Sequence, residues 1–136
     1  MAVAKFIPHL RNEHALHRWD IAGDDDTSLT LLADTDLVEH SVDVLGQILL
    51  AAGREHDPDF HVRLRSEGQQ DLRVLVENGT ASLAWADDDQ DEPSVDIDAA
   101  ARQLFIWGRR PDRHGRLHSH LTQPQLARLQ ALLSGY

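Results

Sequence analysis

The chain has 136 residues and no cysteine, a length that suits one domain with a real hydrophobic core. Its 13 Lys and Arg residues against 23 Asp and Glu residues give a formal net charge of −10, which argues against general binding to nucleic acid or to a membrane surface. The lack of cysteine excludes a disulfide framework and a thiolate metal site, and it fits a reducing cytoplasm. No stretch has the length of a signal sequence core or a membrane span. We therefore expect a soluble cytoplasmic protein.

The first predicted helix runs from Pro8 to about Trp19. Proline suits the first turn of a helix, because its missing N–H would have no partner there. His9 lies on the same stripe of this helix as His17, but the two are about 12 Å apart along the axis. One metal ion cannot easily collect both side chains, so we expect His9 to lie at the surface.

Glu13 and His17 stand four residues apart, so they share one face of this helix. A carboxylate and an imidazole on one face can hold a divalent metal such as zinc, with more ligands from elsewhere. Asp20, three residues after His17, can orient a ligand or a bound water. The alternative interpretation is a solvated face with an ordinary charge pair.

Residues 24–28 form a polar break, which we interpret as a solvated linker that offers caps to the next element. A second, amphipathic helix is predicted from the cap at Asp34 to Ala52, and Gly53 ends it. His40 lies among the polar positions of this helix, so we expect it to be exposed.

From Phe60 the apolar period changes from 3.6 to 2, which indicates strands with one wet face. Asn78-Gly79 is a type I′ hairpin signal. The acidic run 87–93 is expected to be a solvated connection. The predicted strands are 60–65, 72–77, 80–86, 94–97 and an edge strand at 116–120.

A helix is predicted over residues 99–107, with Asp98 as its cap and Gly108 as its stop. Arg109 and Arg110 come next, at the negative end of the helix dipole. They either stabilise the helix end or form an anion site, since guanidinium groups bind carboxylates well.

His118 and His120 share one face of the edge strand at a spacing that zinc can use, although we expect no acidic partner nearby. Thr122 and Gln125 fit a capping box for the closing helix. Together these elements predict an α+β fold, with an antiparallel sheet of four or five strands and helices packed on one face. Residues 1–22 form a preceding helix, and residues 23–136 form the α+β domain.

Two strings carry a family resemblance. Residues 12–20, Asn-Glu-His-Ala-Leu-His-Arg-Trp-Asp, resemble the helix end of mycothiol-dependent maleylpyruvate isomerases and their relatives. Residues 104–109, Leu-Phe-Ile-Trp-Gly-Arg, look like the family's Leu-Leu-Leu-Trp-Gly-Arg string. In that family the first string closes a DinB-like four-helix metal bundle, and a sterol-carrier-like α+β domain comes after it. The resemblance covers nearly the whole chain, but only the last bundle helix and the domain after it.

The resemblance implies roles for four residues. Glu13 and His17 would be two ligands of the metal, and Asp20 an outer-sphere or acid–base residue. Arg109, not Arg110, would clamp the carboxylate of the substrate. In the family a histidine from an early bundle helix completes the site, and the metal activates the mycothiol sulfur as a thiolate. Only twelve residues precede Glu13 here, so we expect a split or truncated version, or a partner chain that supplies the missing helices.

These observations lead to three hypotheses about function. The chain is a C-terminal module that binds or interacts without activity of its own, or it is a thiol-dependent isomerase or transferase completed by a partner. The third is a generic acidic ligand-binding protein with a cavity between sheet and helices. We expect self-association or a partner chain through residues 6–20, because that helix is amphipathic and too short to be stable alone. We expect the isolated chain to hold zinc and mycothiol weakly or not at all.

Overall fold

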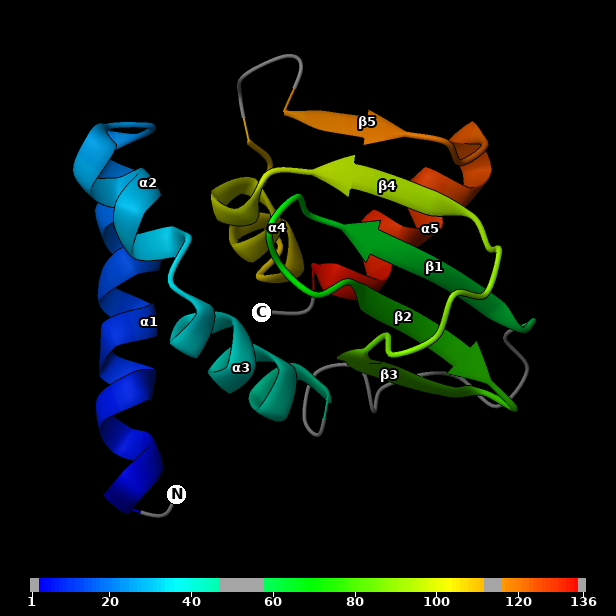
Figure 1. Cartoon of the computed structure of the whole chain (residues 1–136), viewed down its shortest axis with the longest axis horizontal. Coiled ribbons are helices and arrows are strands. Elements are labelled where there is room, and N and C mark those ends of the chain that lie inside the picture. Colours follow the sequence, from blue (N-terminus) through cyan, green and yellow to red (C-terminus); the bar gives the residue numbers. More distant parts are fainter. Residues whose placement is uncertain (1–2, 47–57, 112–115, 135–136) are drawn as a thin grey trace.

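The computed structural model describes residues 3–46, 58–111 and 116–134. Its helices and strands confirm the α+β class predicted from the sequence (Figure 1). In chain order they are α1 (Val3–Ala22), α2 (Asp26–Leu32), α3 (Thr35–Val44), β1 (Phe60–Arg65), β2 (Leu72–Glu77), β3 (Thr80–Trp85), β4 (Ser94–Ile97), α4 (Ala99–Ile106), β5 (Leu117–Ser119) and α5 (Gln123–Leu133).

The strands form a five-stranded sheet in the order β3-β2-β1-β4-β5. The pairs β1–β2, β2–β3 and β4–β5 are antiparallel as expected, but β4 runs parallel to β1. The reason lies in the connection after β3, which crosses the open face of the sheet to reach the free edge of β1. The predicted hairpin is confirmed, since Asn78 and Gly79 have φ values of 51° and 76°, as a type I′ turn requires.

The sheet has one apolar and one polar face. Val62, Leu64 and Val74 are fully buried on the apolar face, which α4 and α5 cover (Figure 1). Every residue of α4 from Ala100 to Ile106 is buried. Helix α4 lies between the sheet and the helices α1 and α3. On the sheet side Arg102 donates to the carbonyls of Leu64 and Gln70, and on the other side Gln103 donates to Asn12 of α1 and Ser41 of α3.

Helix α1 is longer than predicted. It begins at Val3, so Pro8 lies inside the helix and not in its first turn. Proline removes one intrahelical hydrogen bond, whose acceptor is the carbonyl of Ala4. Ala4 is exposed, so water can satisfy that carbonyl at little cost.

The polar break at 24–28 contains the start of a helix that the sequence patterns did not predict. The Asp25 side chain accepts a hydrogen bond from the backbone N–H of Ser28 at 2.7 Å and caps α2. Helix α3 begins after the cap at Asp34 as predicted. Its predicted continuation over residues 47–52 lies outside the described residues. None of the helices in the described ranges is both long and apolar enough to cross a membrane.

Candidate functional site

The structure brings Glu13, His17, Asp20 and Arg109 into one line of contacts. Glu13 Oε2 lies 3.2 Å from His17 Nε2, and His17 Nδ1 lies 3.3 Å from Asp20 Oδ2. Arg109 donates to both Asp20 oxygens, from Nη2 at 2.9 Å and from Nε at 3.3 Å. Helix spacing explains the first two contacts, whereas the last joins two residues 89 positions apart.

The end of α4 positions Arg109. Gly108 has a φ of 79°, and a Cβ at this position would lie 2.9 Å from the carbonyl oxygen of Leu133, so only glycine fits the turn. The Arg109 N–H then bonds back to the carbonyl of Leu104 at 2.9 Å. Its Nη1 donates to the carbonyl of Trp107 at 3.0 Å, which fixes the side chain toward α1.

Charge and hydrogen bonding set the state of Asp20. The hydrogen bond from Arg109 lowers the pKa of this carboxyl below its usual value against the opposing effect of burial, and His17 adds to the lowering. Asp20 is therefore a carboxylate at neutral pH, and it accepts a hydrogen bond from Nδ1–H of His17. A carboxylate that binds one imidazole nitrogen in this way orients the other nitrogen, as in carboxylate–histidine–metal sites.

The other nitrogen of His17, Nε2, lies 3.2 Å from Glu13 Oε2. Two acceptors at this distance need a proton or a cation between them. Two ligands of a tetrahedral zinc ion with ~2.0 Å bonds lie about 3.3 Å apart, so the pair matches two corners of such a site. An ordinary salt bridge with a protonated histidine also fits, since the His17 side chain is 62% exposed.

The described residues offer only half of a metal site. Within the described ranges no group of three or more His, Asp or Glu side chains is placed to hold a metal ion. Asp20 is already bound to Arg109 and to Nδ1 of His17. A catalytic zinc takes three protein ligands and keeps one open position, so at least one further donor must come from elsewhere.

Two histidine predictions near this site are wrong. His9 is half-buried, and its Nδ1 lies 3.3 Å from Nε2 of His40. His40 is only 6% exposed, and burial lowers its pKa. The sequence placed His40 among polar positions of α3, but α1 packs on that side and covers it.

The His118/His120 pair also differs from expectation. The register of β4 and β5 places Asp96 opposite His118, and Asp96 Oδ2 lies 2.9 Å from Nε2 of His120. An acidic partner is therefore present. Both His120 and Asp96 are well exposed, so this is an ion pair at the edge of the sheet.

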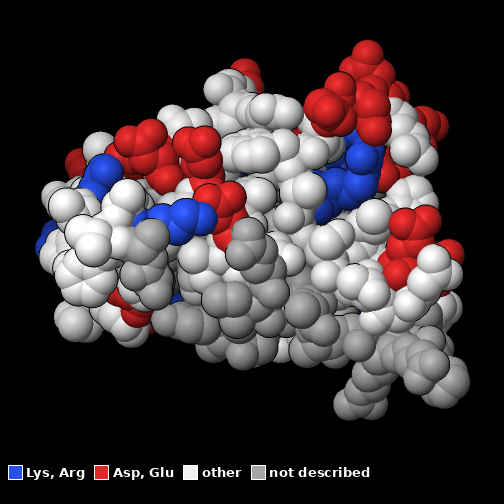
Figure 2. Space-filling model, turned by 90° about the horizontal axis from the view of Figure 1, so that it is seen from below, with Lys and Arg blue, Asp and Glu red and all other residues white. Residues whose placement is uncertain are grey.

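Sequence reasoning missed a cluster of charges on the open face of the sheet. Arg63 is 4% exposed and bonds to Glu92, Asp71 and Asp88; Arg73 bonds to Glu92 and Asp88. The run 87–93 is thus not simply a solvated connection, since the Glu92 side chain is fully buried. Figure 2 shows Lys and Arg atoms lying directly against Asp and Glu atoms at one end of the molecule. Basic residues at alternate strand positions, followed by an acidic run, were the available signal.

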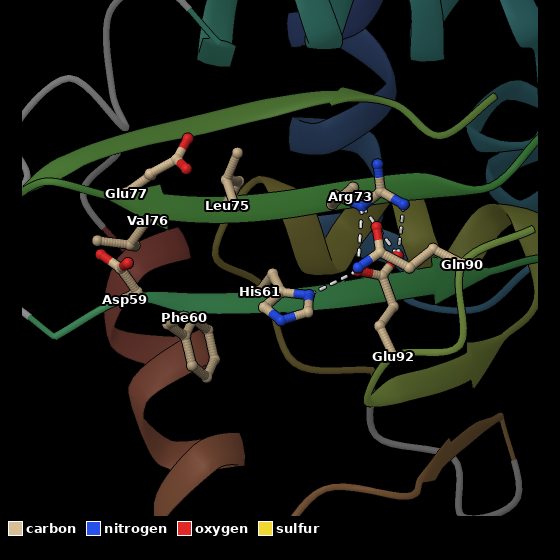
Figure 3. Close-up of a pocket in the computed structure, with 9 residues that line it drawn as sticks. All are labelled: Asp59, Phe60, His61, Arg73, Leu75, Val76, Glu77, Gln90 and Glu92. Atoms are coloured by element: carbon tan, nitrogen blue, oxygen red, sulfur yellow. Dashed lines mark hydrogen bonds and ion pairs between the residues drawn. The ribbon is translucent and has the colours of Figure 1, made fainter. Parts of the chain in front are cut away.

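A cavity of about 370 Å³ lies beside this cluster on the open face (Figure 3). His61 points toward Glu92, with 2.7 Å between Nδ1 and Oε2, and Asp59 and Glu77 lie at the far end. The third hypothesis expected a cavity between sheet and helices, whereas this one lies on the opposite, polar face.

No protein-family model matches the chain, and no curated protein matches it in sequence. The family resemblance of residues 12–20 and 104–109 therefore stays a prediction.

Proposed function

We propose that this chain is a binding module that carries half of a divalent metal site. Glu13 and His17 supply two ligands, and donors from another helical element complete the site. One observation carries the proposal: the Glu13 and His17 acceptors face each other at 3.2 Å, on a histidine whose other nitrogen is held by Asp20.

The family resemblance supports a more specific version. The module would be the C-terminal part of a mycothiol-dependent maleylpyruvate isomerase, and its metal, when bound, would hold the mycothiol sulfur as a reactive thiolate. The purified chain alone is then expected to lack isomerase activity. Completed by a partner, the same residues would serve a thiol-dependent isomerase or transferase.

The contacts of Asp20 and Arg109 indicate their roles. Asp20 holds His17 in the tautomer whose Nε2 can bind a metal. Arg109 was expected to clamp a substrate carboxylate, but the carboxylate it binds here is that of Asp20. We therefore propose that Arg109 positions Asp20, and that it reaches a substrate only by sharing its remaining N–H groups.

The test is a metal titration of the chelator-treated chain, with Co²⁺ absorbance and Zn²⁺ calorimetry as readouts. We expect weak, saturable binding that His17→Ala and Glu13→Gln abolish. Asp20→Asn should weaken the metal affinity by roughly 10- to 100-fold, as is typical when a metal-binding histidine loses the carboxylate that orients it. His118→Ala is the matched control, because it removes another exposed imidazole from the same chain. No saturable binding, or binding that depends on His118 instead, would overturn the proposal.

A further inference from the structure

The outer face of α1 carries six exposed side chains in one line. They alternate at spacings of four and three residues, and we call them the α1 seam: Val3, Ile7, Leu10, His14, His17 and Ile21. The apolar members are 89%, 67%, 51% and 90% exposed in that order. From Val3 to Ile21 the seam spans roughly 27 Å of helix axis.

The chain packs against the opposite side of the helix. Asn12, Ala15 and Leu16 are the buried residues of α1, and α3 and the sheet lie on one side of this helix (Figure 1). The exposed fractions show that the described residues leave the seam open to solvent. Single exposed apolar residues are ordinary, but four in one line indicate an interface.

The spacing indicates what covers the seam. Apolar residues that alternate at three and four positions are typical of a helix that pairs with another helix as a two-stranded coiled coil. His14 and His17 occupy the two central positions of the repeat, so a partner helix that covers the seam also covers the metal half-site.

The charges beside the seam indicate the orientation. Glu13 and Asp20 line one flank, and Arg11 and Arg18 line the other. In a parallel pair of identical helices the acidic flank of each copy faces the basic flank of the other, whereas an antiparallel pair sets acid against acid. Arg11 and Arg18 also bind acids of their own chain, but their side chains remain 47% and 34% exposed. An arginine has five N–H donors, so each can serve a second carboxylate.

We propose that two copies of this chain pair in parallel through the α1 seam. The pairing covers His17 of each copy, whereas the two Glu13 side chains lie on opposite sides of the pair, each facing the basic flank of the other copy. The pairing stands on the seam and its flanks and does not depend on the proposed function. One short helix per copy buries a small area, so the dimer is of the weak, concentration-dependent class.

Because the chain has no cysteine, a single introduced thiol reports the pairing and its direction. Parallel pairing sets position 7 against position 7, so Ile7→Cys should form disulfide-linked dimers on mild oxidation. Ala127→Cys, at an exposed position of α5, is the matched control and should not. An antiparallel pair in register would set position 7 against position 17, so it would link a mixture of Ile7→Cys and His17→Cys chains. A disulfide between positions 7 and 17 would overturn the proposal. So would a yield of disulfide-linked dimer from Ile7→Cys that is no higher than the yield from Ala127→Cys.

Sedimentation of the full chain after treatment with a chelator, over a range of protein concentrations, gives the second readout. We expect a monomer–dimer equilibrium that Leu10→Lys abolishes and Ala127→Lys leaves unchanged. A chain that stays monomeric, yet binds metal through His17, would overturn the pairing and leave the metal half-site intact. A parallel dimer that binds no metal would support the pairing and contradict the proposed function. A parallel dimer that also binds metal through His17 would support both.

Discussion

At the residue scale, a buried polar cluster joins the two halves of the candidate site. Gln103 donates to Asn12 Oδ1 and to Ser41 Oγ, each at 2.7 Å, and Trp107 Nε1 donates to Ser41 Oγ at 2.8 Å. All four residues have 0% exposure. The cluster binds α4 to α1 and α3, and so holds Arg109 within reach of α1. Asn12 and Trp107, which belong to the two strings that suggested a family, thus have a structural role here.

Ser41→Ala should lower the free energy of unfolding by roughly 1–3 kcal/mol, because Gln103 and Trp107 each lose a buried hydrogen bond to its hydroxyl and one such bond contributes about 0.5–1.5 kcal/mol. Urea unfolding measures the effect. Ser134→Ala, which removes an exposed hydroxyl bonded to the Ala131 carbonyl, is the control and should change stability little. Equal losses in the two variants would show that the cluster adds nothing beyond an ordinary hydrogen bond.

Arg109→Ala should raise the pKa of the Asp20 carboxyl toward the ordinary value of about 3.9, because the largest cause of its lowering is the hydrogen bond from Arg109. Side-chain carboxyl NMR shifts over a pH titration measure it directly. Arg110→Ala is the matched control and should leave Asp20 unchanged. If both variants shift the pKa of Asp20 alike, general charge and not the Arg109 contact sets that pKa.

Titration with a small dicarboxylate compares the two arginines for anion binding. We expect Arg109→Ala to lose more affinity for the dicarboxylate than Arg110→Ala does.

At the element scale, the connection between β3 and β4 decides the topology of the sheet. It crosses over β2 and β1, and the carbonyl of Pro93 accepts from the N–H of Arg63 at 2.9 Å before β4 begins. Hydrogen bonds from Arg73 lower the pKa of Asp88 to about 2. Burial raises the pKa of Glu92, but hydrogen bonds from Arg73 and His61 outweigh it, so the net shift is downward. The charge cluster therefore holds the crossing segment as long as its carboxyls are ionised.

This dependence gives a pH prediction for Glu92→Gln. The carboxyl groups of Asp88 and Glu92 both have folded-state pKa values below their unfolded values of about 4. The stability that these two carboxylates contribute is therefore full above pH ~5 and is lost as pH falls toward 2. At pH 7 the substitution should cost about 3–5 kcal/mol, because it leaves buried Arg63 short of a partner. The difference from the unaltered chain in urea unfolding should shrink in acid, as pH falls through the lowered pKa of the Glu92 carboxyl. Glu77→Gln, on the same face but exposed, is the control. A difference that persists in acid would mean packing, not charge, is responsible.

The sequence predicted the elements whose signals are local. The period of two predicted the strands, and the caps Asp98 and Thr122 predicted the starts of α4 and α5. Helix α2 was missed because its first turn is a polar run that also suits a linker. The burial of Arg63 was missed because strand alternation marks its position as exposed, and the burial of Glu92 was missed because an acidic run suits a solvated connection. For the site, spacing predicted the Glu13–His17 pair, but nothing local predicted that Arg109 would reach Asp20.

At the scale of the whole molecule, the acidic excess remains at the surface while many arginines are used internally. Arg63, Arg73 and Arg116 have side chains that are 5%, 17% and 14% exposed, and each binds acids of its own chain. The formal net charge of −10 is therefore carried mostly by exposed carboxylates. Two copies repel one another at long range, although the seam through which we expect them to pair is apolar or neutral along most of its length.

Dimerisation through the α1 seam should therefore strengthen as salt rises. At about 10 mM ionic strength the Debye length is roughly 30 Å, so the full acidic surfaces of two chains repel, whereas at about 150 mM it is roughly 8 Å. Salt also weakens the flank pairs of Arg11 and Arg18, but exposed ion pairs contribute only ~0–1 kcal/mol each, and these arginines already share their charge with Asp34 and Asp25. Apolar contact along the seam does not weaken with salt. Sedimentation at the two salt concentrations should show a larger dimer fraction at the higher one, and Leu10→Lys should stay monomeric at both. Dissociation of the dimer by added salt would show that the charged flanks, and not the apolar seam, hold the two copies together.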